Sequence, residues 1–439
     1  MKKLFTTFLL CSAAILAKAN TYYVSSTGND ANNGRSISEA WNTLDAVTNF
    51  PFVSGDIVLL QGGITFNGNI KKTGLNGVTF SSYGVGKATI SSDMLAGIWL
   101  SDANNITIKN LIFKGAGYMT TTMWKNGIDF IMSANATGHS TNSIIDNIES
   151  YGYGGMGVSF YTESALYGFK NITVTNSLFH DNGMAGLNIT GSWDDPNSLI
   201  RYSNSNVYIA NCKAYYNHGR RDYKDNWSGS GILVAGTVGG LVEYCEAYEN
   251  GKDNGSMVGG PIGIWMDDSK FVTIQYCVSH HNKGGPARTD GGGFDIDGGT
   301  YGSVIQHCDS YENEGTGYGL FQWTTGNKWS NDTIRNCTSF NDGRNTKYGA
   351  FTFWGASPNH KVTNAEIYGN RVTVDKAGKA LSFLGNYFSN VNVHDNEFCI
   401  VSPAVLYTTL ASNVTLSNNT FPCQVLSVRT GSFKVKRIS

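Results

Sequence analysis

The chain has 439 residues and a formal net charge of -1, and only 15% of its residues are charged. This near-neutral charge gives no sign of a nucleic-acid partner, so we expect none. Its length allows a large core, and 53 glycines against 7 prolines indicate many turns.

Residues 1–19 have the order of a secretory signal peptide. Lys2 and Lys3 precede a mostly apolar run over residues 4–16, and Ala17-Lys18-Ala19 follows as a small-residue cleavage site. The run is too short to span a bilayer comfortably, so we expect no membrane insertion. The mature chain is therefore predicted to be secreted or periplasmic. Removal of Cys11 would leave seven of the eight cysteines.

A seven-residue motif recurs five times within residues 207–342, for example as Tyr244-Cys245-Glu-Ala-Tyr-Glu-Asn250. Its cysteine stands at positions 212, 245, 277, 308 and 337, so the steps are 33, 32, 31 and 29 residues. Such a period indicates a solenoid, in which each coil buries its apolar face only by stacking on its neighbours. Less regular copies extend the array over residues 106–111, 144–148, 172–177, 365–370, 391–396 and 414–419.

Short runs that alternate apolar and polar residues precede each cysteine, as in residues 207–210 and 272–275. This alternation predicts strands with one buried face, and glycine, Asn and Asp fill the gaps where helical spacing is absent. The predicted fold is all-β: a single-stranded parallel β-helix over residues 20–423 with about 10–13 coils, about 4.8 Å apart. Residues 424–439 form a C-terminal tail or cap.

Stacking places equivalent residues in columns. The five cysteines form an inward column of thiols, and the Asn residues at 217, 250, 282 and 313 form a second column at a turn. Cys399 and Cys423 stand outside the cysteine column, and a disulfide between them is left open.

A second strand follows each cysteine motif. In this strand Ile232, Ile264 and Phe294 are expected to point inward, together with Val234, Met266 and Ile296. The predicted outward residues are Leu233, Ala235, Trp265, Asp267, Asp295, Asp297, Phe321, Trp323, Phe351 and Phe353. We interpret Trp265, Phe321, Trp323 and Phe351 as platforms for the apolar faces of sugars, with burial beneath loops as the alternative.

Three of these outward residues are acids. Asp295 and Asp297 are about 6.6 Å apart along one strand, and Asp267 lies one coil, about 4.8 Å, from Asp297. These spacings suit the paired carboxyls of glycoside hydrolysis, and crowded like charges raise the pKa of one member. With Asp268, the same acids could instead bind Ca²⁺ as hard oxygen ligands. The alternative is that the Asp-Gly pairs here are turn formers.

Basic residues occupy the loops that lead into these strands. Arg220, Arg221, His281, Lys283 and Arg288 are expected to form one rim of a cleft. A basic rim suits an anionic polysaccharide, and the alternative is solvated loop charge.

Residues 21–44, 55–62 and 78–88 carry a resemblance to a known group. The opening Thr-Tyr-Tyr-Val-Ser-Ser-Thr-Gly-Asn-Asp is similar to the N-terminal cap of secreted right-handed β-helix (pectate-lyase-like) carbohydrate-active proteins. The resemblance implies a right-handed helix and a polysaccharide substrate. Thr289-Asp290-Gly291 and Asp267-Asp268 resemble motifs of polygalacturonase-type hydrolases, which implies aspartate catalysis. The calcium-dependent lyases of the same fold imply a Ca²⁺ site, with Lys283 or Arg288 as the base.

These observations predict a monomeric enzyme that hydrolyses a polysaccharide, with Asp295, Asp297 and Asp267 as the acid/base set. A calcium-dependent polysaccharide lyase and a non-catalytic glycan-binding β-helix stay open as alternatives.

Overall fold

The computed structural model describes residues 18–423, apart from residues 121, 123, 165, 193–201, 325–326, 346 and 402. The predicted signal peptide up to residue 17 and the predicted tail of residues 424–439 lie outside the described residues.

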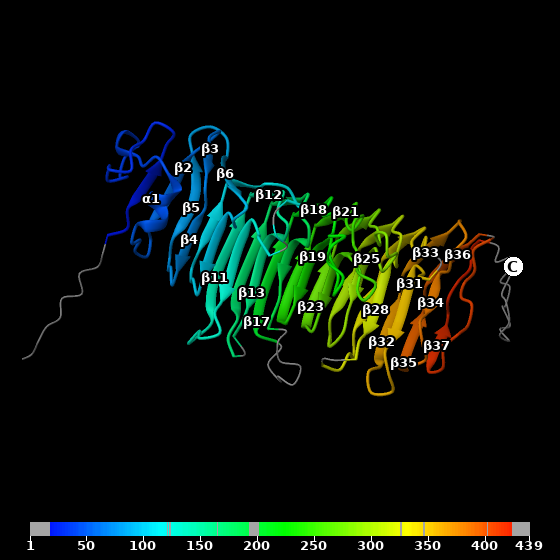
Figure 1. Ribbon diagram of the computed structural model, residues 1–439. Helices are drawn as coiled ribbons and strands as arrows, with labels where there is room; N and C mark the ends of the chain where they lie inside the picture. The colour runs from blue at the N-terminus through cyan, green and yellow to red at the C-terminus, as the bar shows by residue number, and fades with distance from the viewer. Residues whose placement is uncertain are drawn as a thin grey trace, which may run out of the picture.

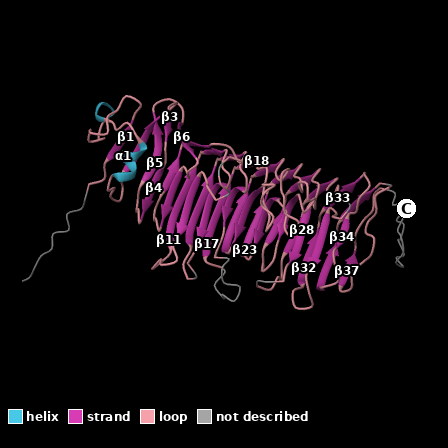
Figure 2. Ribbon diagram, viewed as in Figure 1, coloured by secondary structure: helices cyan, strands magenta, loops and turns pink. Residues whose placement is uncertain are grey.

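Three long sheets make up the described part of the chain, with 14, 12 and 11 strands. The chain passes through sheet A, sheet B and sheet C in turn, and strands of successive coils pair in parallel. The coils stack into an elongated molecule with β1 near one end and β37 at the other (Figures 1 and 2). The predicted parallel β-helix is confirmed.

Sheet A contains β1 (Thr21–Val24), β2 (Ile57–Gln61), β5 (Thr79–Tyr83), β8 (Thr107–Lys109), β11 (Ser140–Asp146), β14 (Phe169–Thr175), β17 (Asn204–Ala210), β20 (Thr237–Glu243), β23 (Lys270–Gln275), β26 (Val304–Gln306), β29 (Thr333–Arg335), β32 (Val362–Tyr368), β35 (Phe388–His394) and β37 (Val414–Ser417). Sheet B contains β3 (Thr65–Asn67), β6 (Ala88–Asp93), β9 (Leu111–Gly115), β12 (Glu149–Tyr151), β15 (Leu178–His180), β18 (Lys213–Tyr215), β21 (Glu246–Tyr248), β24 (Val278–His280), β27 (Asp309–Tyr311), β30 (Thr338–Phe340), β33 (Arg371–Val374) and β36 (Glu397–Ile400). Sheet C contains β4 (Ile70–Thr73), β7 (Ile98–Ser101), β10 (Ile128–Met132), β13 (Met156–Thr162), β16 (Ala185–Ile189), β19 (Ser230–Ala235), β22 (Ile262–Asp267), β25 (Gly292–Ile296), β28 (Tyr318–Gln322), β31 (Phe351–Gly355) and β34 (Leu381–Phe383).

Both predicted columns are present inside the helix. The five cysteines are buried free thiols. In the second column, the side-chain amide of Asn217 donates to Asn250 at 3.0 Å, Asn250 donates to Asn282 at 3.0 Å, and Asn282 donates to Asn313 at 2.8 Å. These amides satisfy one another at a buried bend, where an unpaired polar group would be costly.

The same column ends on an acid. Asn313 donates its side-chain amide to Asp342 at 2.8 Å, and the other carboxyl oxygen of Asp342 accepts from the Ser339 hydroxyl at 2.7 Å. Burial raises the pKa of Asp342 to about 6.

The interior at sheet C is built from stacked apolar side chains. Phe294 stacks on Tyr318 with ring centroids 5.3 Å apart, and Tyr318 stacks on Phe351 at 5.2 Å. Phe351 and Phe353 are fully buried in the core. The prediction that these two rings point outward is therefore wrong. Thr352 pairs with Gly319 in the ladder, so the true register differs by three residues from the predicted one, and an odd shift exchanges the faces.

Glycine fixes the start of the sheet C strands. A Cβ atom on Gly263 would lie 2.0 Å from the Ser279 hydroxyl, and one on Gly293 would lie 2.4 Å from that of Ser310. Only a residue without a side chain lets sheet C begin so close to sheet B.

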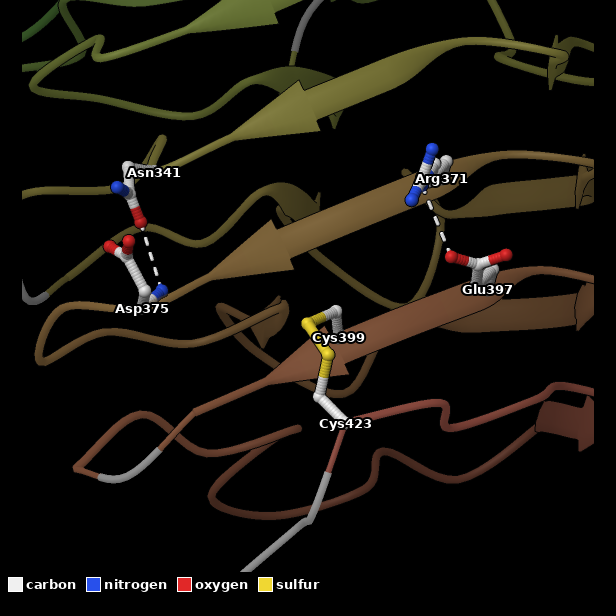
Figure 3. Close-up of a disulfide and its surroundings, with 6 residues drawn as sticks. All are labelled: Asn341, Arg371, Asp375, Glu397, Cys399 and Cys423. Carbon is white, nitrogen blue, oxygen red and sulfur yellow. Dashed lines mark hydrogen bonds and ion pairs between the residues drawn. A yellow bond between two sulfur atoms is a disulfide. The ribbon is translucent and has the colours of Figure 1, made fainter.

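The two ends of the described solenoid are closed differently. At the N-terminal end, α1 (Leu44–Asn49) and a 3-10 helix (Ile37–Glu39) accompany a cluster of rings in which Tyr22 stacks on Trp41. At the C-terminal end, Cys399 of β36 forms a disulfide with Cys423, 24 residues further on (Figure 3). The disulfide left open by the sequence is therefore present. Among the described helices, none is sufficiently long and apolar to cross a membrane.

Candidate functional site

The outward face of sheet C is unusual because it is buried. Every residue of β16, β19, β22, β25 and β28 is buried, including those that alternate away from the core. Part of the cover comes from the loop between β18 and β19: Trp227 packs on Trp265 with its ring perpendicular and 5.3 Å away. The outward side chains of sheet C are therefore shielded from solvent, whereas those on an uncovered sheet face would be hydrated.

One outward row crosses several coils of this face in register. Asp129 of β10 pairs with Ser159, Ser159 pairs with Asn188, and Asn188 pairs with Leu233. Leu233 then pairs with Trp265, and Trp265 with Asp295. The row from Asp129 to Asp295 takes five coil steps, which is about 24 Å.

Asp267 and Asp297 lie beside each other in the next outward row. Met266 pairs with Ile296, and the backbone N–H of Asp297 donates to the carbonyl of Met266 at 2.9 Å. The predicted neighbourhood of these two acids on adjacent coils is confirmed. The indole Nε1–H of Trp323 donates to Asp267 Oδ1 at 3.2 Å, and Asp297 Oδ1 accepts from the backbone of Gly298 at 2.7 Å.

The acids shift one another's pKa values. Burial, together with the nearby Asp297 and Asp268, raises the pKa of Asp267 well above its usual range. Burial, with smaller contributions from Asp290 and Asp268, raises the pKa of Asp297 to about 7. A carboxyl that stays protonated near neutral pH can act as a general acid, and its ionised neighbour can act as a base or nucleophile.

Asp295 is the most secluded member of the set. It is 2% exposed, and its Oδ1 forms no hydrogen bond with any described residue. Burial first, and then Asp297, Asp290 and Asp267, raise its pKa well above the usual range.

Asp290 joins the acids from the loop before β25. It accepts hydrogen bonds from the hydroxyl of Tyr348 at 2.9 Å and from the backbone of Gly260 at 2.8 Å. Burial raises its pKa, and it lies near enough to Asp295 and Asp297 to raise theirs.

The four aromatic residues predicted as sugar platforms differ in direction and burial. Trp265 points outward but is only 3% exposed beneath Trp227. Phe321 also points outward, is 7% exposed, and pairs with Trp354 of the next coil. Trp323 is half-buried and contacts Asp267. Phe351 lies in the core, so its predicted role on the surface is wrong.

The predicted basic rim is mostly engaged in ion pairs. Arg220 is 5% exposed and binds both carboxyl oxygens of Asp222, at 3.0 and 2.6 Å. Arg221 binds Asp253 at 2.7 Å, and Lys283 binds Glu249 at 2.6 Å.

The two other basic-rim residues lie elsewhere on these loops. His281 lies at the turn after β24, where its Nδ1 is 2.8 Å from that of His280. Arg288 is exposed on the loop before β25. The structure brings together the predicted acids, but it does not gather the predicted bases around them.

The acids do not form a metal centre. Within the described residues, no three His, Cys, Asp or Glu side chains converge as metal ligands would. Asp268 instead accepts from the side chain of Asn327 at 3.0 Å, and Asp267 is held by Trp323. The donor set of Asp267, Asp268, Asp295 and Asp297 therefore does not fit the Ca²⁺ site that the sequence left open.

Several residues of this face escaped the sequence interpretation. Asp129 is 7% exposed, and burial raises its pKa to about 6. Gly127-Ile-Asp129-Phe repeats the pattern of Gly293-Phe-Asp295-Ile, and this repetition is the signal that could have found it. Asn188 follows the same pattern in Gly186-Leu-Asn188-Ile, whereas Tyr348 and Trp227 lie on loops and carry no comparable signal.

The family model described as "Right handed beta helix region" matches residues 164–338. Among solved structures, a GH136 lacto-N-biosidase from Eubacterium ramulus is similar with a TM-score of 0.64 and 17% identity. That match covers 92% of this chain and 68% of the other. The A-module of the mannuronan C-5 epimerase AlgE6 from Azotobacter vinelandii has a TM-score of 0.56 and 12% identity, and the match covers 84% and 91%. No curated protein matches the chain. At such identities the solved structures show the fold alone: the chain is a right-handed parallel β-helix.

Proposed function

We propose that this protein is a secreted or periplasmic enzyme that hydrolyses glycosidic bonds of a polysaccharide, with Asp267 and Asp297 as its acid–base pair. The observation that carries the proposal is the position of these two carboxyls. They stand side by side on adjacent coils of a sheltered surface, with both pKa values raised. Structural neighbours whose names specify action on glycans support the same substrate class.

Asp267 and Asp297 take different roles in the proposed reaction. Asp267 is the more buried member, and burial and the neighbouring acids favour its protonated form, so it donates a proton to the glycosidic oxygen of the leaving group. Asp297 is partly exposed and ionises at about pH 7, so it activates water or attacks the anomeric carbon. Hydrolysis then returns one proton from water to the pair.

The surroundings support these roles. Trp323 donates to Asp267 and holds its carboxyl in place, so it acts as a positioning residue. Asp290 lies near enough to Asp297 to raise its pKa, and ionised Asp297 stabilises the positive charge that develops on the sugar ring in the transition state.

The lyase alternative has less support. The acids do not converge as Ca²⁺ ligands within the described residues, and Lys283 is held by Glu249. Arg288 is then the only predicted base that the described structure leaves without an ion pair.

The test is the product chemistry on a panel of neutral, uronate and sulfated polysaccharides. Hydrolysis predicts new reducing ends without ultraviolet absorbance from unsaturated chain ends. A rise in that absorbance would establish the lyase alternative instead. Binding without either product would make the protein a glycan-binding module and overturn the proposal. Asp309→Asn, at the exposed first residue of β27, is the matched control for Asp297→Asn.

A further inference from the structure

We propose that the substrate is an uncharged glycan that lies over the outward face of β16, β19, β22 and β25, with Asn188, Trp265 and Trp227 as binding residues. This inference rests on the proposed function and names its substrate class. It replaces the anionic substrate that the sequence predicted.

The first argument is the set of buried polar atoms on this face. Asn188 Oδ1, Trp265 Nε1 and Asp295 Oδ1 are buried and form no hydrogen bond with any described residue. Asn188 and Trp265 are 3% exposed and Asp295 is 2% exposed. The three lie on one row over about 14 Å, three coil steps. Buried polar atoms nearly always have partners, so this row needs hydrogen-bond partners that the described residues do not supply.

The mixture of donors and acceptors favours hydroxyl groups. Trp265 Nε1 can only donate, and Asn188 Oδ1 can only accept. A sugar hydroxyl both donates and accepts, so it can satisfy either atom. A carboxylate or sulfate group has no proton to donate, so only a hydroxyl of the glycan can pair with Asn188 Oδ1.

Charge points the same way. The row and its neighbour carry Asp129, Asp295, Asp267 and Asp297, and no base in the described part of the chain forms an ion pair with any of these four. Arg220, Arg221 and Lys283 bind Asp222, Asp253 and Glu249 instead. Lys125 lies near Asp129 and Lys347 near Asp290, so these two bases also face acids of the protein. An anionic polymer would therefore find no free base to pair with along this surface.

Aromatic rings supply the remaining surface. Trp227 covers Trp265, and Tyr223 packs beside Trp227 against Met156 and Met184. Trp124 meets Tyr223 at 6.2 Å and is 58% exposed. Rings among a few directed polar groups are typical of sites that bind uncharged ligands.

The experiment measures binding by calorimetry with Asp297→Asn, so that turnover does not interfere. The probes are hexamers of glucose, N-acetylglucosamine, galacturonate and sulfated galactose. We expect a neutral hexamer to bind at least about tenfold more tightly than either anionic one. Tighter binding of an anionic hexamer, or no binding of any probe by the folded protein, would overturn the inference.

Subsite variants make the assignment specific. Asn188→Ala, and Trp265→Phe, which keeps an apolar ring and loses the N–H, should each weaken binding of the neutral hexamer about tenfold. Tyr208→Phe on sheet A is the control and should bind as the parent does. Unchanged binding in both subsite variants would contradict the proposed surface.

The two proposals fail separately. If Asp297→Asn binds a neutral hexamer but the wild-type protein cleaves no glycan, the proposed function is wrong and the inference holds. If the wild-type protein hydrolyses polygalacturonate, the function holds and the inference is wrong.

Discussion

Asp297 lies directly beside Asp267 although 30 residues separate them, because the N–H of Asp297 completes the parallel ladder at the carbonyl of Met266, 2.9 Å away. Neither residue has an ion-pair partner among the described residues; Asp267 is buried, and Asp297 is partly exposed. The β-helix thus places the carboxyl groups of Asp267 and Asp297 one coil spacing apart, so the protonation of one affects the pKa of the other.

Stability should depend on pH through Asp297. Its folded pKa of about 7 lies above the ordinary 3.8, so the native state binds more protons than the unfolded state between these values. The free energy of unfolding should therefore fall as pH rises from about 4 to 7, by about 1.4 kcal/mol per pH unit from this group. Asp297→Asn removes this slope.

Urea unfolding at pH 5, 6, 7 and 8 measures the effect, with Asp309→Asn as the control. The same pH dependence in wild type and Asp297→Asn would show that Asp297 titrates normally in the folded protein.

Asp342→Asn should stabilise the protein above pH 6. The pKa of about 6 means that ionising buried Asp342 lowers stability as pH rises from about 4 to 6. The asparagine continues the amide column from Asn313 without a charge. The gain should reach up to about 3 kcal/mol at pH 8 and vanish near pH 4. Denaturation at both pH values tests it. The converse change, Asn313→Asp, should destabilise the protein, and a gain from it would contradict this account of the column.

Trp323→Phe should shift the pH profile of activity. The indole N–H stabilises the ionised form of Asp267, so its loss raises the pKa of Asp267 further. Because Asp267 must be protonated to act as the acid, the alkaline limb of kcat/KM should move up by about one pH unit. Trp99→Phe, far along sheet C, should leave the profile unchanged. An unshifted alkaline limb in Trp323→Phe would rule out Asp267 as the group that the limb reports.

The disulfide should stabilise the C-terminal coil. It joins residues 24 positions apart, and closing a loop of this length contributes about 3 kcal/mol in the chain-entropy model. The double variant Cys399→Ala/Cys423→Ala should therefore melt at a lower temperature, and reductant should lower the melting temperature of the wild type alone. A wild-type melting curve that reductant does not change would contradict this role.

The five column thiols should resist labelling in the native state, because they are buried.

The sequence predicted the solenoid and its columns because a repeat copies one physical environment many times. The residues equivalent to Cys245 and Asn250 have the same neighbours in each coil. The motif therefore predicts both the fold and the direction of each side chain. Asp267 and Asp297 became predictable neighbours in the same way.

What the sequence missed lies where the repeat is broken. The coil from Asn313 to Phe351 has its own loop lengths, so alignment on glycines slipped by three residues and turned Phe351 to the wrong face. Lys283 does not line a cleft rim, because it pairs with Glu249 one coil away, and the repeat does not show that these two residues meet. Ion pairs between adjacent coils neutralise the bases of the predicted rim. The sequence pattern of a single coil does not indicate such ion pairs.

The most direct test of the account is the rate of reducing-end release by Asp297→Asn on a glycan that the wild-type protein cleaves. The account predicts a loss of about 10²–10⁴-fold in kcat, with unchanged substrate binding and a folded protein at pH 5, while Asp309→Asn keeps full activity. Wild-type turnover by Asp297→Asn would contradict the proposal that the paired acids of sheet C perform the chemistry.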